Sequence, residues 1–386
     1  MASDSFLFRM DTPVLFGDGV TQKLAEKVKE FKASKVLIVT DKGVKQAGIL
    51  EKVEQLLRDD GLEVIVFDEV EPDPSLETIH KGADFFKQVG CDLMVALGGG
   101  SPIDTAKGIR VIVDNGGHIR DYAGVNKVPQ RASLPLITIP TTSGTGSEVT
   151  IFAVLSDWEY NMKITITSPY LAADLALVDP LLTVSAPPQI TAASGIDALA
   201  HAIETYVSNI SQPLADALAL KAIQIIGANL RPAVANGNNL AARNQMALGS
   251  LMAGMAFNNA FLGITHSIGA ALSGHVHVSH GIAIALLLPH VMEYNAMARM
   301  EKYRDIALAL GEKVENISLR AAALAAAKSV YELVGDVNLP QHLSELGVKE
   351  EDLPGIAKDT LGHGMVKMNP RKPTEADILA ILRKAL

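Results

Sequence analysis

The chain has 386 residues, of which 48% are hydrophobic and 20% are charged, and its formal net charge is −9. A chain of this length is longer than one hydrophobic core usually accommodates, which predicts two domains. The acidic balance argues against general nucleic-acid binding, because that function needs a basic surface.

The single cysteine, Cys91, excludes a disulfide framework and indicates a reducing compartment. The N-terminal sequence MASDSFLFRMDTP has no basic segment followed by an apolar one, so no signal peptide is expected. No apolar run approaches the ~20 residues that span a bilayer, and the run over 283–288 stops at Pro289. These features predict a cytoplasmic protein without a membrane partner.

Residues 1–184 alternate short β-rich runs with amphipathic segments. Strands are predicted over residues 35–40, 63–67, 92–97 and 135–139, with 163–167 and 174–178 as the last strands, and helices over 48–60 and 76–89. This alternation predicts a parallel α/β sheet with right-handed crossovers.

The composition changes after Asp179-Pro180, and the domain boundary is placed after residue 184. Residues 185–386 are rich in Ala, Leu and Met and have helical periodicity with almost no strand signal. Helices are predicted over residues 189–207, 214–229, 242–262, 281–297, 316–334, 341–345 and 374–385. We therefore expect an α/β dinucleotide-binding domain over 1–184 and an all-helical metal-binding domain over 185–386.

Asp41 ends the first clear strand of the α/β domain. A carboxylate at this position can accept hydrogen bonds from the adenosine ribose and would repel a 2′-phosphate, which predicts NAD over NADP. The alternative is an ordinary turn residue.

A glycine-rich loop, Gly98-Gly99-Gly100-Ser101-Pro102, joins a strand to a helix. Glycines allow close approach of the backbone to a phosphate, Ser101 suits the N-cap and Pro102 the first helical position. The helix N-terminus would then offer N–H groups to a pyrophosphate. The spacing is not GxGxxG, so a tight structural turn is an equal alternative.

A second polar loop, residues 140–148, follows the next strand and reads PTTSGTGSE. Hydroxyl groups at the carboxyl end of a strand suit hydrogen bonds to ribose and phosphate, because ligands of open α/β sheets bind at that end. A surface loop without a ligand is the alternative.

Four residues in the helical half are suitable ligands for a divalent metal. Asp197 and His201 stand four residues apart and share one face of a helix, and His266 and His280 come from a second segment. Oxygen and nitrogen donors from two segments, with a position left open, are typical of catalytic metals. The absence of thiolate favours Fe²⁺, with Zn²⁺ or Mn²⁺ as alternatives. Histidines satisfied within the core are the competing interpretation.

Taken together, these motifs resemble the iron-containing (group III) alcohol dehydrogenases, and most of all their lactaldehyde reductase and 1,3-propanediol dehydrogenase branch. The likeness runs from about Phe6 to the C-terminus and rests on GGGSPIDTAK, PTTSGTGSEVT, GIDALAHAIE, the His266–His280 pair and ALLLPHVMEYN. The resemblance implies a Rossmann-like N-terminal domain and an all-helical C-terminal domain, the fold shared with dehydroquinate synthase. It also implies a cleft that holds cofactor and metal, and a homodimer or larger homo-oligomer.

The resemblance also implies roles for individual residues. The implied metal ligands are Asp197, His201, His266 and His280, and the implied NAD contacts are Gly98, Gly99, Ser101, Thr141, Thr142 and Thr145. Asp104 would lie close to the nicotinamide and Lys163 near the ribose.

The chain departs from the family at the position four residues after His266. Many members have a histidine there that helps in proton transfer, whereas this chain has Ala270. His277, and after it His275, are the candidates to replace that group, with solvent water as the alternative. Phe152 stands where the lactaldehyde branch has a small polar residue, which argues against recognition of a polar diol.

The predicted function is metal-dependent, NAD-linked hydride transfer between small primary alcohols and aldehydes. Candidate apolar walls of the substrate pocket are Phe152, Phe257, Phe261 and Met365. One alternative is different chemistry on the same fold, either a lyase resembling dehydroquinate synthase or a hydroxyacid–oxoacid transhydrogenase. The other is a metal-free dinucleotide-binding protein.

Overall fold

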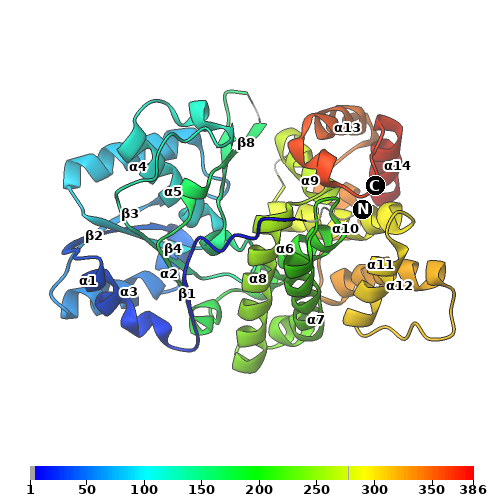
Figure 1. The fold of residues 1–386 in the computed structure, drawn as a ribbon, viewed down its shortest axis with the longest axis horizontal. Helices are drawn as coiled ribbons and strands as arrows, with labels where there is room; N and C mark the ends of the chain where they lie inside the picture. The colour runs from blue at the N-terminus through cyan, green and yellow to red at the C-terminus, as the bar shows by residue number, and fades with distance from the viewer. Residues whose placement is uncertain (1–4, 161, 277) are drawn as a thin grey trace. The chain divides into compact units, whose positions relative to one another are not determined.

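The computed structural model describes residues 5–160, 162–276 and 278–386. They form two compact units, one made of Met10–Ala186 and the other of Pro187–Leu386 together with residues 5–9 (Figure 1). The first unit is α/β and the second is helical, so the predicted fold class is confirmed.

Six parallel strands make the main sheet of the α/β unit. In spatial order they are β1 (Val14–Phe16), β9 (Leu175–Val178), β6 (Leu136–Pro140), β4 (Leu93–Gly98), β2 (Lys35–Asp41) and β3 (Glu63–Val70). β4 is buried along its whole length, and β2 is buried except at its two ends, because both faces of the sheet are covered.

Alternate residues of β2 belong to different hydrophobic cores. Val36 and Ile38 pack with α1 (Leu24–Glu30) and α3 (Ile49–Asp59) on one face. Leu37 and Val39 pack on the other face with α4 (Leu76–Val89) and α5 (Gly100–Asn115). The period-two alternation of side chains along a strand produces this division.

The strand order places a topological switch point between β2 and β4. From β2 the chain adds β3 on one side, and it then adds β4, β6 and β9 in turn on the other side. In doubly wound sheets, ligands bind beyond the carboxyl ends of the strands at such a point. Asp41 and Gly98 end these two strands.

One predicted strand is wrong in its placement. Residues 163–167 were expected among the last strands of the parallel sheet, but β8 (Met162–Thr167) lies in a separate sheet of order β5-β8-β7. It pairs antiparallel with β7 (Phe152–Asp157) and parallel with β5 (Gly124–Val125). The antiparallel partner is β7, which was not predicted, so residues 163–167 form a small sheet outside the six parallel strands.

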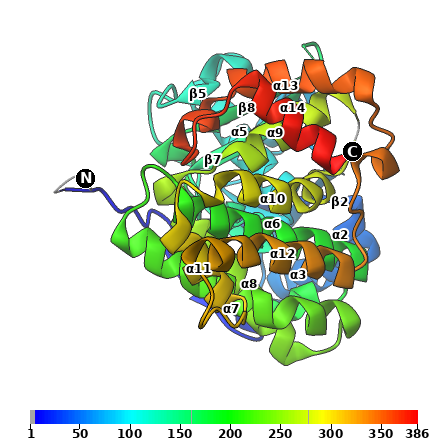
Figure 2. The ribbon, with the colours of Figure 1, turned by 90° about the vertical axis from the view of Figure 1, so that its right-hand side faces the viewer.

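The second unit is built around α6 (Pro188–Val207), whose side chains are nearly all buried from Thr191 onward. It packs against α7 (Pro213–Ala235), α8 (Leu240–Ala260) and α10 (His280–Ala296), and α10 also packs against α12 (Leu319–Asp336) (Figure 2). The remaining helices are α9 (Ile264–His275), α11 (Met300–Ala309), α13 (Leu353–Gly362) and α14 (Glu375–Ala385). Residues 5–9 join this unit through Arg9, whose backbone N–H and C=O both bond the Asn259 amide at 2.6 and 3.0 Å.

Most of the predicted helices are present, but α9, α11 and α13 were not predicted. The segment over 341–345 is a short 3-10 turn, Leu343–Leu346. α9 is buried on nearly all sides over its first turns, so it has no alternation of apolar and polar residues that could reveal its period.

Among the described residues, no single helix has the length and apolar character to span a membrane. Only the pair α8 and α9, bent by 96° between them, passes such a test jointly.

Lys107 anchors the polar loop after β6 to α5. Its side chain is fully buried, and its Nζ donates to the backbone oxygens of Ser147 and Phe152, both at 2.7 Å. Burial lowers the pKa of Lys107 to about 8, although Asp104 and Glu148 act to raise it. The ammonium is therefore the internal counter-charge for the carboxylates of Asp104 and Glu148.

Lys107→Met should destabilise the α/β unit by about 3–5 kcal/mol, because it leaves Asp104 and Glu148 without their buried partner. Urea unfolding followed by circular dichroism measures the loss. Lys81→Met, at an exposed site on α4, is the control and should change stability by less than about 0.5 kcal/mol. Equal stability of the two variants would contradict this role for Lys107.

Candidate active site

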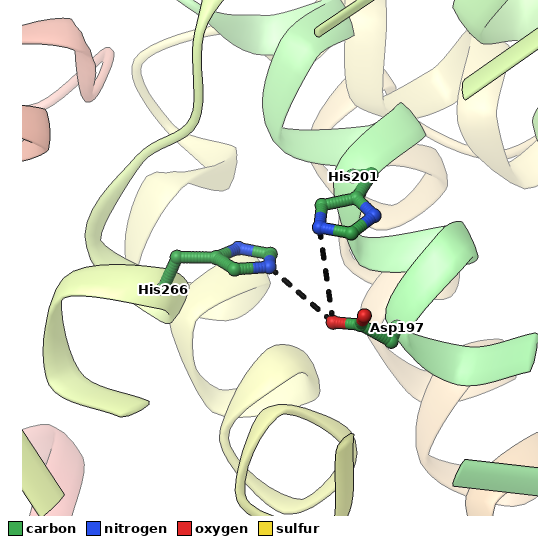
Figure 3. A group of neighbouring side chains, drawn as sticks. All are labelled: Asp197, His201 and His266. Atoms are coloured by element: carbon green, nitrogen blue, oxygen red, sulfur yellow. Dashed lines mark ion pairs between the residues drawn. The ribbon is translucent and has the colours of Figure 1, made fainter. Parts of the chain in front are cut away.

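A carboxylate and two imidazoles meet in the core of the helical unit. Asp197 and His201 lie one turn apart on α6, and His266 comes from the first turn of α9 (Figure 3). The Oδ1 atom of Asp197 is 3.8 Å from Nε2 of His201 and 3.4 Å from Nε2 of His266. One potential ligand atom from each residue lies within 4.8 Å of the others, and all three side chains are buried.

His280 approaches the same carboxylate from the start of α10. Its Nε2 is 3.7 Å from Oδ1 of Asp197, its ring centroid is 5.6 Å from that of His266, and a third of its side chain is exposed. His280 lies outside the compact three-residue group, and it is the residue of the four that is most exposed to solvent.

The cluster fits a cation because its buried donor atoms point at one another. Within the described part of the chain, neither Oδ1 of Asp197 nor Nε2 of His266 has a hydrogen-bond partner. Burial acts to raise the pKa of Asp197, but His201, His266 and His280 outweigh it and hold that pKa below its usual range. Burial likewise acts to lower the pKa of His266, but Asp197 and Glu204 raise it to about 9. A divalent cation would compete with protons for these atoms.

Sequence reasoning missed Glu204, although it stands within the motif GIDALAHAIE. Its Oε2 lies 2.7 Å from Nδ1 of His266, on the side of the ring away from Asp197. Burial acts to raise the pKa of Glu204, but the contact with His266 prevails and lowers it. The available signal was its spacing of seven residues from Asp197, which is two turns along the same face of α6.

Two of the predicted cofactor residues, Asp41 and Gly98, lie side by side at the switch point of the α/β unit. Gly98 has φ +150°, and a Cβ there would meet Cγ of Pro102 at 2.5 Å and Oδ2 of Asp41 at 3.3 Å. Only glycine allows this approach. Asp41 also caps α2 (Lys42–Gln46), because its Oδ1 accepts from the backbone N–H of Val44 at 2.9 Å.

The start of α5 differs from the prediction in one detail. The N-cap is Gly99, not Ser101, and Ser101 lies in the first turn. No side chain described here caps this helix start, which leaves the amide groups suited to an external anion.

The second polar loop lies directly against the glycine loop. The Cβ position of Gly99 is 3.2 Å from Oγ1 of Thr142, and that of Gly100 is 2.8 Å from Cγ2 of Thr145. The backbone N–H of Thr141 donates to the carbonyl of Gly98 at 2.9 Å. The two loops are therefore in direct contact.

Asp104 and Lys163 are both engaged by neighbouring protein groups. The Asp104 carboxylate accepts from the Ser147 hydroxyl and from the backbone N–H of Val154 at 2.9 Å. Nζ of Lys163 bonds Oδ1 of Asp73 at 2.6 Å. Asp104 thereby ties the polar loop and β7 to α5, and Lys163 ties β8 to the segment that follows β3.

One of the two candidate relay histidines, His275, is among the described residues. His277 lies outside the described residues. His275 ends α9, and its Nε2 is 2.7 Å from Oδ2 of Asp359, so one of its nitrogens is used in an ion-pair contact.

Of the four candidate pocket residues, Phe257 lies directly at the cluster. Its ring stacks on His201 with centroids 4.7 Å apart. Phe261 ends the same helix with φ +56°, while Phe152 begins β7 and Met365 lies in the turn Gly364–Met368.

Comparison with known proteins accounts for both units. The family model "Iron-containing alcohol dehydrogenase" matches residues 11–180, and "Fe-containing alcohol dehydrogenase family, C-terminal" matches residues 191–386. The 1,3-propanediol dehydrogenase of Klebsiella pneumoniae is 42% identical, with 96% of each chain covered. The NAD-dependent methanol dehydrogenase of Bacillus methanolicus is 40% identical, over 96% of this chain and 97% of that protein.

The fold comparison agrees with the sequence comparison. A crystal structure of 1,3-propanediol oxidoreductase matches with a TM-score of 0.96 and 41% identity, covering 99% of this chain and 100% of that one. Nothing in these likenesses favours the lyase alternative. The chain therefore belongs to the iron-containing alcohol dehydrogenase family, and it is an oxidoreductase that interconverts alcohols and aldehydes.

Proposed function

We propose that the chain is a divalent-metal-dependent, NAD(H)-linked oxidoreductase acting on small primary alcohols and their aldehydes. The observation that carries the proposal is the buried group of Asp197, His201 and His266, whose donor atoms face one another. These three residues, with His280, would hold the metal. Fe²⁺ is the proposed ion, and Zn²⁺ or Mn²⁺ could occupy the same oxygen and nitrogen donors.

The proposed NAD site consists of Asp41, Gly98, Gly99, Ser101, Asp104, Thr141, Thr142, Thr145 and Lys163. The proposal is supported by the convergence of Gly98, Thr142 and Asp41 at the sheet's switch point. The likeness to a protein named NAD-dependent methanol dehydrogenase supports the same cofactor. Since Asp104 and Lys163 already bond Ser147 and Asp73, we assign them to orienting the loops on which the nicotinamide ribose would rest.

Two relatives bear the names of short alcohols, methanol and 1,3-propanediol, which supports a small substrate. Phe257 gives an apolar wall beside His201, and we propose Phe152, Phe261 and Met365 as further walls. A cytoplasmic location and a homodimeric or larger assembly are part of the same proposal.

The proposed mechanism assigns positioning and charge to the protein. When bound, the metal supplies a Lewis acid for the substrate oxygen, and NAD carries the hydride. Asp197 contributes a buried negative charge that remains ionised. Phe257 covers one face of His201 and excludes water from it. His277 would exchange the alcohol proton with solvent, a role that histidine side chains can take near neutral pH.

Removal of the metal should abolish activity and leave NADH binding largely intact, because the metal donors and the cofactor residues belong to different units. Dialysis against a chelator, followed by assays of NADH oxidation with a small aldehyde panel and of NADH fluorescence, measures both effects. Re-addition of Fe²⁺ should restore the rate, and His266→Ala should be folded but nearly inactive. Full activity in a sample shown to be metal-free would overturn the proposal.

Asp41 should make the enzyme prefer NAD(H) to NADP(H). Asp41→Asn retains an oxygen that can cap α2 but removes the charge facing a 2′-phosphate, so it should improve kcat/KM for NADPH with little change in stability. Asp84→Asn, an exposed site on α4, is the charge-matched control. Equal use of both cofactors by the wild type would show that Asp41 does not face the ribose.

His277→Ala should lower kcat and shift its pH profile without loss of metal. A general acid–base group contributes about 10²–10⁴-fold, and we expect the low end or less, because the metal itself favours the alkoxide. His275→Ala is the matched comparison and should instead weaken the contact with Asp359. If the double variant keeps the wild-type kcat at every pH, solvent water carries the proton.

A further inference from the structure

We propose that Glu204 is a positioning residue that sets the protonated nitrogen of His266 and, through the same carboxylate, holds the start of α9. The inference rests on the proposed metal site and extends it to a residue outside the ligand set. Glu204 lies on α6, the helix that also carries Asp197 and His201. One helix would therefore supply two ligands directly and orient a third.

The carboxylate of Glu204 is buried and makes three contacts with the segment that carries His266. Its Oε2 lies 2.7 Å from Nδ1 of His266 and accepts from the backbone N–H of Gly263 at 3.0 Å. Its Oε1 accepts from the backbone N–H of Thr265 at 2.6 Å. A single side chain thus holds both the imidazole and the backbone on either side of Ile264.

These backbone contacts replace a local helix cap. The N-cap of α9 is Gly263, which has no side chain to satisfy the first amides of the helix. Asn369 supplies the third acceptor, since its Oδ1 lies 3.4 Å from the backbone N of Ile264. A Cβ at Gly263 would approach Oδ1 of Asn369 to 2.9 Å and Oε1 of Glu204 to 3.0 Å, so the close approach depends on glycine.

The contact with the ring determines which nitrogen faces the cluster. An ionised carboxylate only accepts hydrogen bonds, so Nδ1 of His266 must carry the proton. In the neutral ring, the lone pair is then on Nε2, the atom 3.4 Å from Oδ1 of Asp197. Histidine ligands commonly donate their second N–H to a carboxylate, and loss of that partner costs 10–100-fold in metal affinity.

The main test is the affinity of the metal-free protein for Zn²⁺, measured by competition with a chromophoric chelator. Glu204→Gln should weaken binding about 10–100-fold, because one amide oxygen cannot accept from all three donors. Asn369→Ala is the matched control. It removes the other cap of α9 without touching His266, so it should lower stability yet change the affinity by less than about threefold.

Two results would overturn the inference. One is a Glu204→Gln protein that is folded and binds Zn²⁺ as the wild type does. The other is an equal loss of affinity in Asn369→Ala, which would make Glu204 a helix cap and nothing more. If the wild type itself binds no divalent cation, the proposed metal function fails first, so the two failures are distinguishable.

A second measurement needs no variant and covers the case in which Glu204→Gln does not fold. In ¹⁵N-histidine-labelled, Zn²⁺-loaded wild type, long-range ¹H–¹⁵N spectra identify the protonated nitrogen of each ring. The His266 signals, assigned by their loss in His266→Gln, should report a proton on Nδ1 and metal on Nε2. The reverse assignment would overturn the proposal.

Discussion

The helical unit depends on one buried carboxylate, that of Asp197. Moving an ion of this kind out of water costs several kcal/mol unless other charges offset it, and here the offset comes from three imidazoles. Two of them, His266 and His280, stand at the starts of α9 and α10, so the positions of these helix starts determine how well the charge is offset. The burial of α6 and the capping of α9 by Glu204 hold these residues in place.

In the α/β unit the main constraint is the close approach of two loops to each other and to α5. Gly98 makes room for Asp41 and Pro102, and Lys107 draws the polar loop onto α5 from below. The charges that support this arrangement are internal, because the fully buried Lys107 ammonium lies near Asp104 and Glu148.

Elements and site residues could be predicted where the pattern that defines them lies within one segment of the sequence. The strand over residues 35–40 and the helix over 189–207 were predicted because apolar runs and their period lie within one segment. The start of α9 could not be predicted, since its cap comes from Glu204, about sixty residues earlier. Residues 163–167 were correctly identified as a strand but assigned to the wrong sheet, because pairing with Phe152–Asp157 is a tertiary choice. The Asp197 and His201 pair was the easiest site feature, as four-residue spacing on a helix is visible in the sequence.

Because of the contact between Arg9 and Asn259, the α/β unit can be completed during synthesis before the helical unit. Residues 5–9 belong with residues 187–386, so residues 10–186 interrupt the helical unit along the chain. A ribosome delivers Met10–Ala186 as an uninterrupted piece that can fold early. The two bonds between the Arg9 backbone and the Asn259 amide, however, cannot form until Asn259 has emerged. A fragment cut at residue 187 would for the same reason be an incomplete helical unit, whereas residues 10–186 are continuous in the chain.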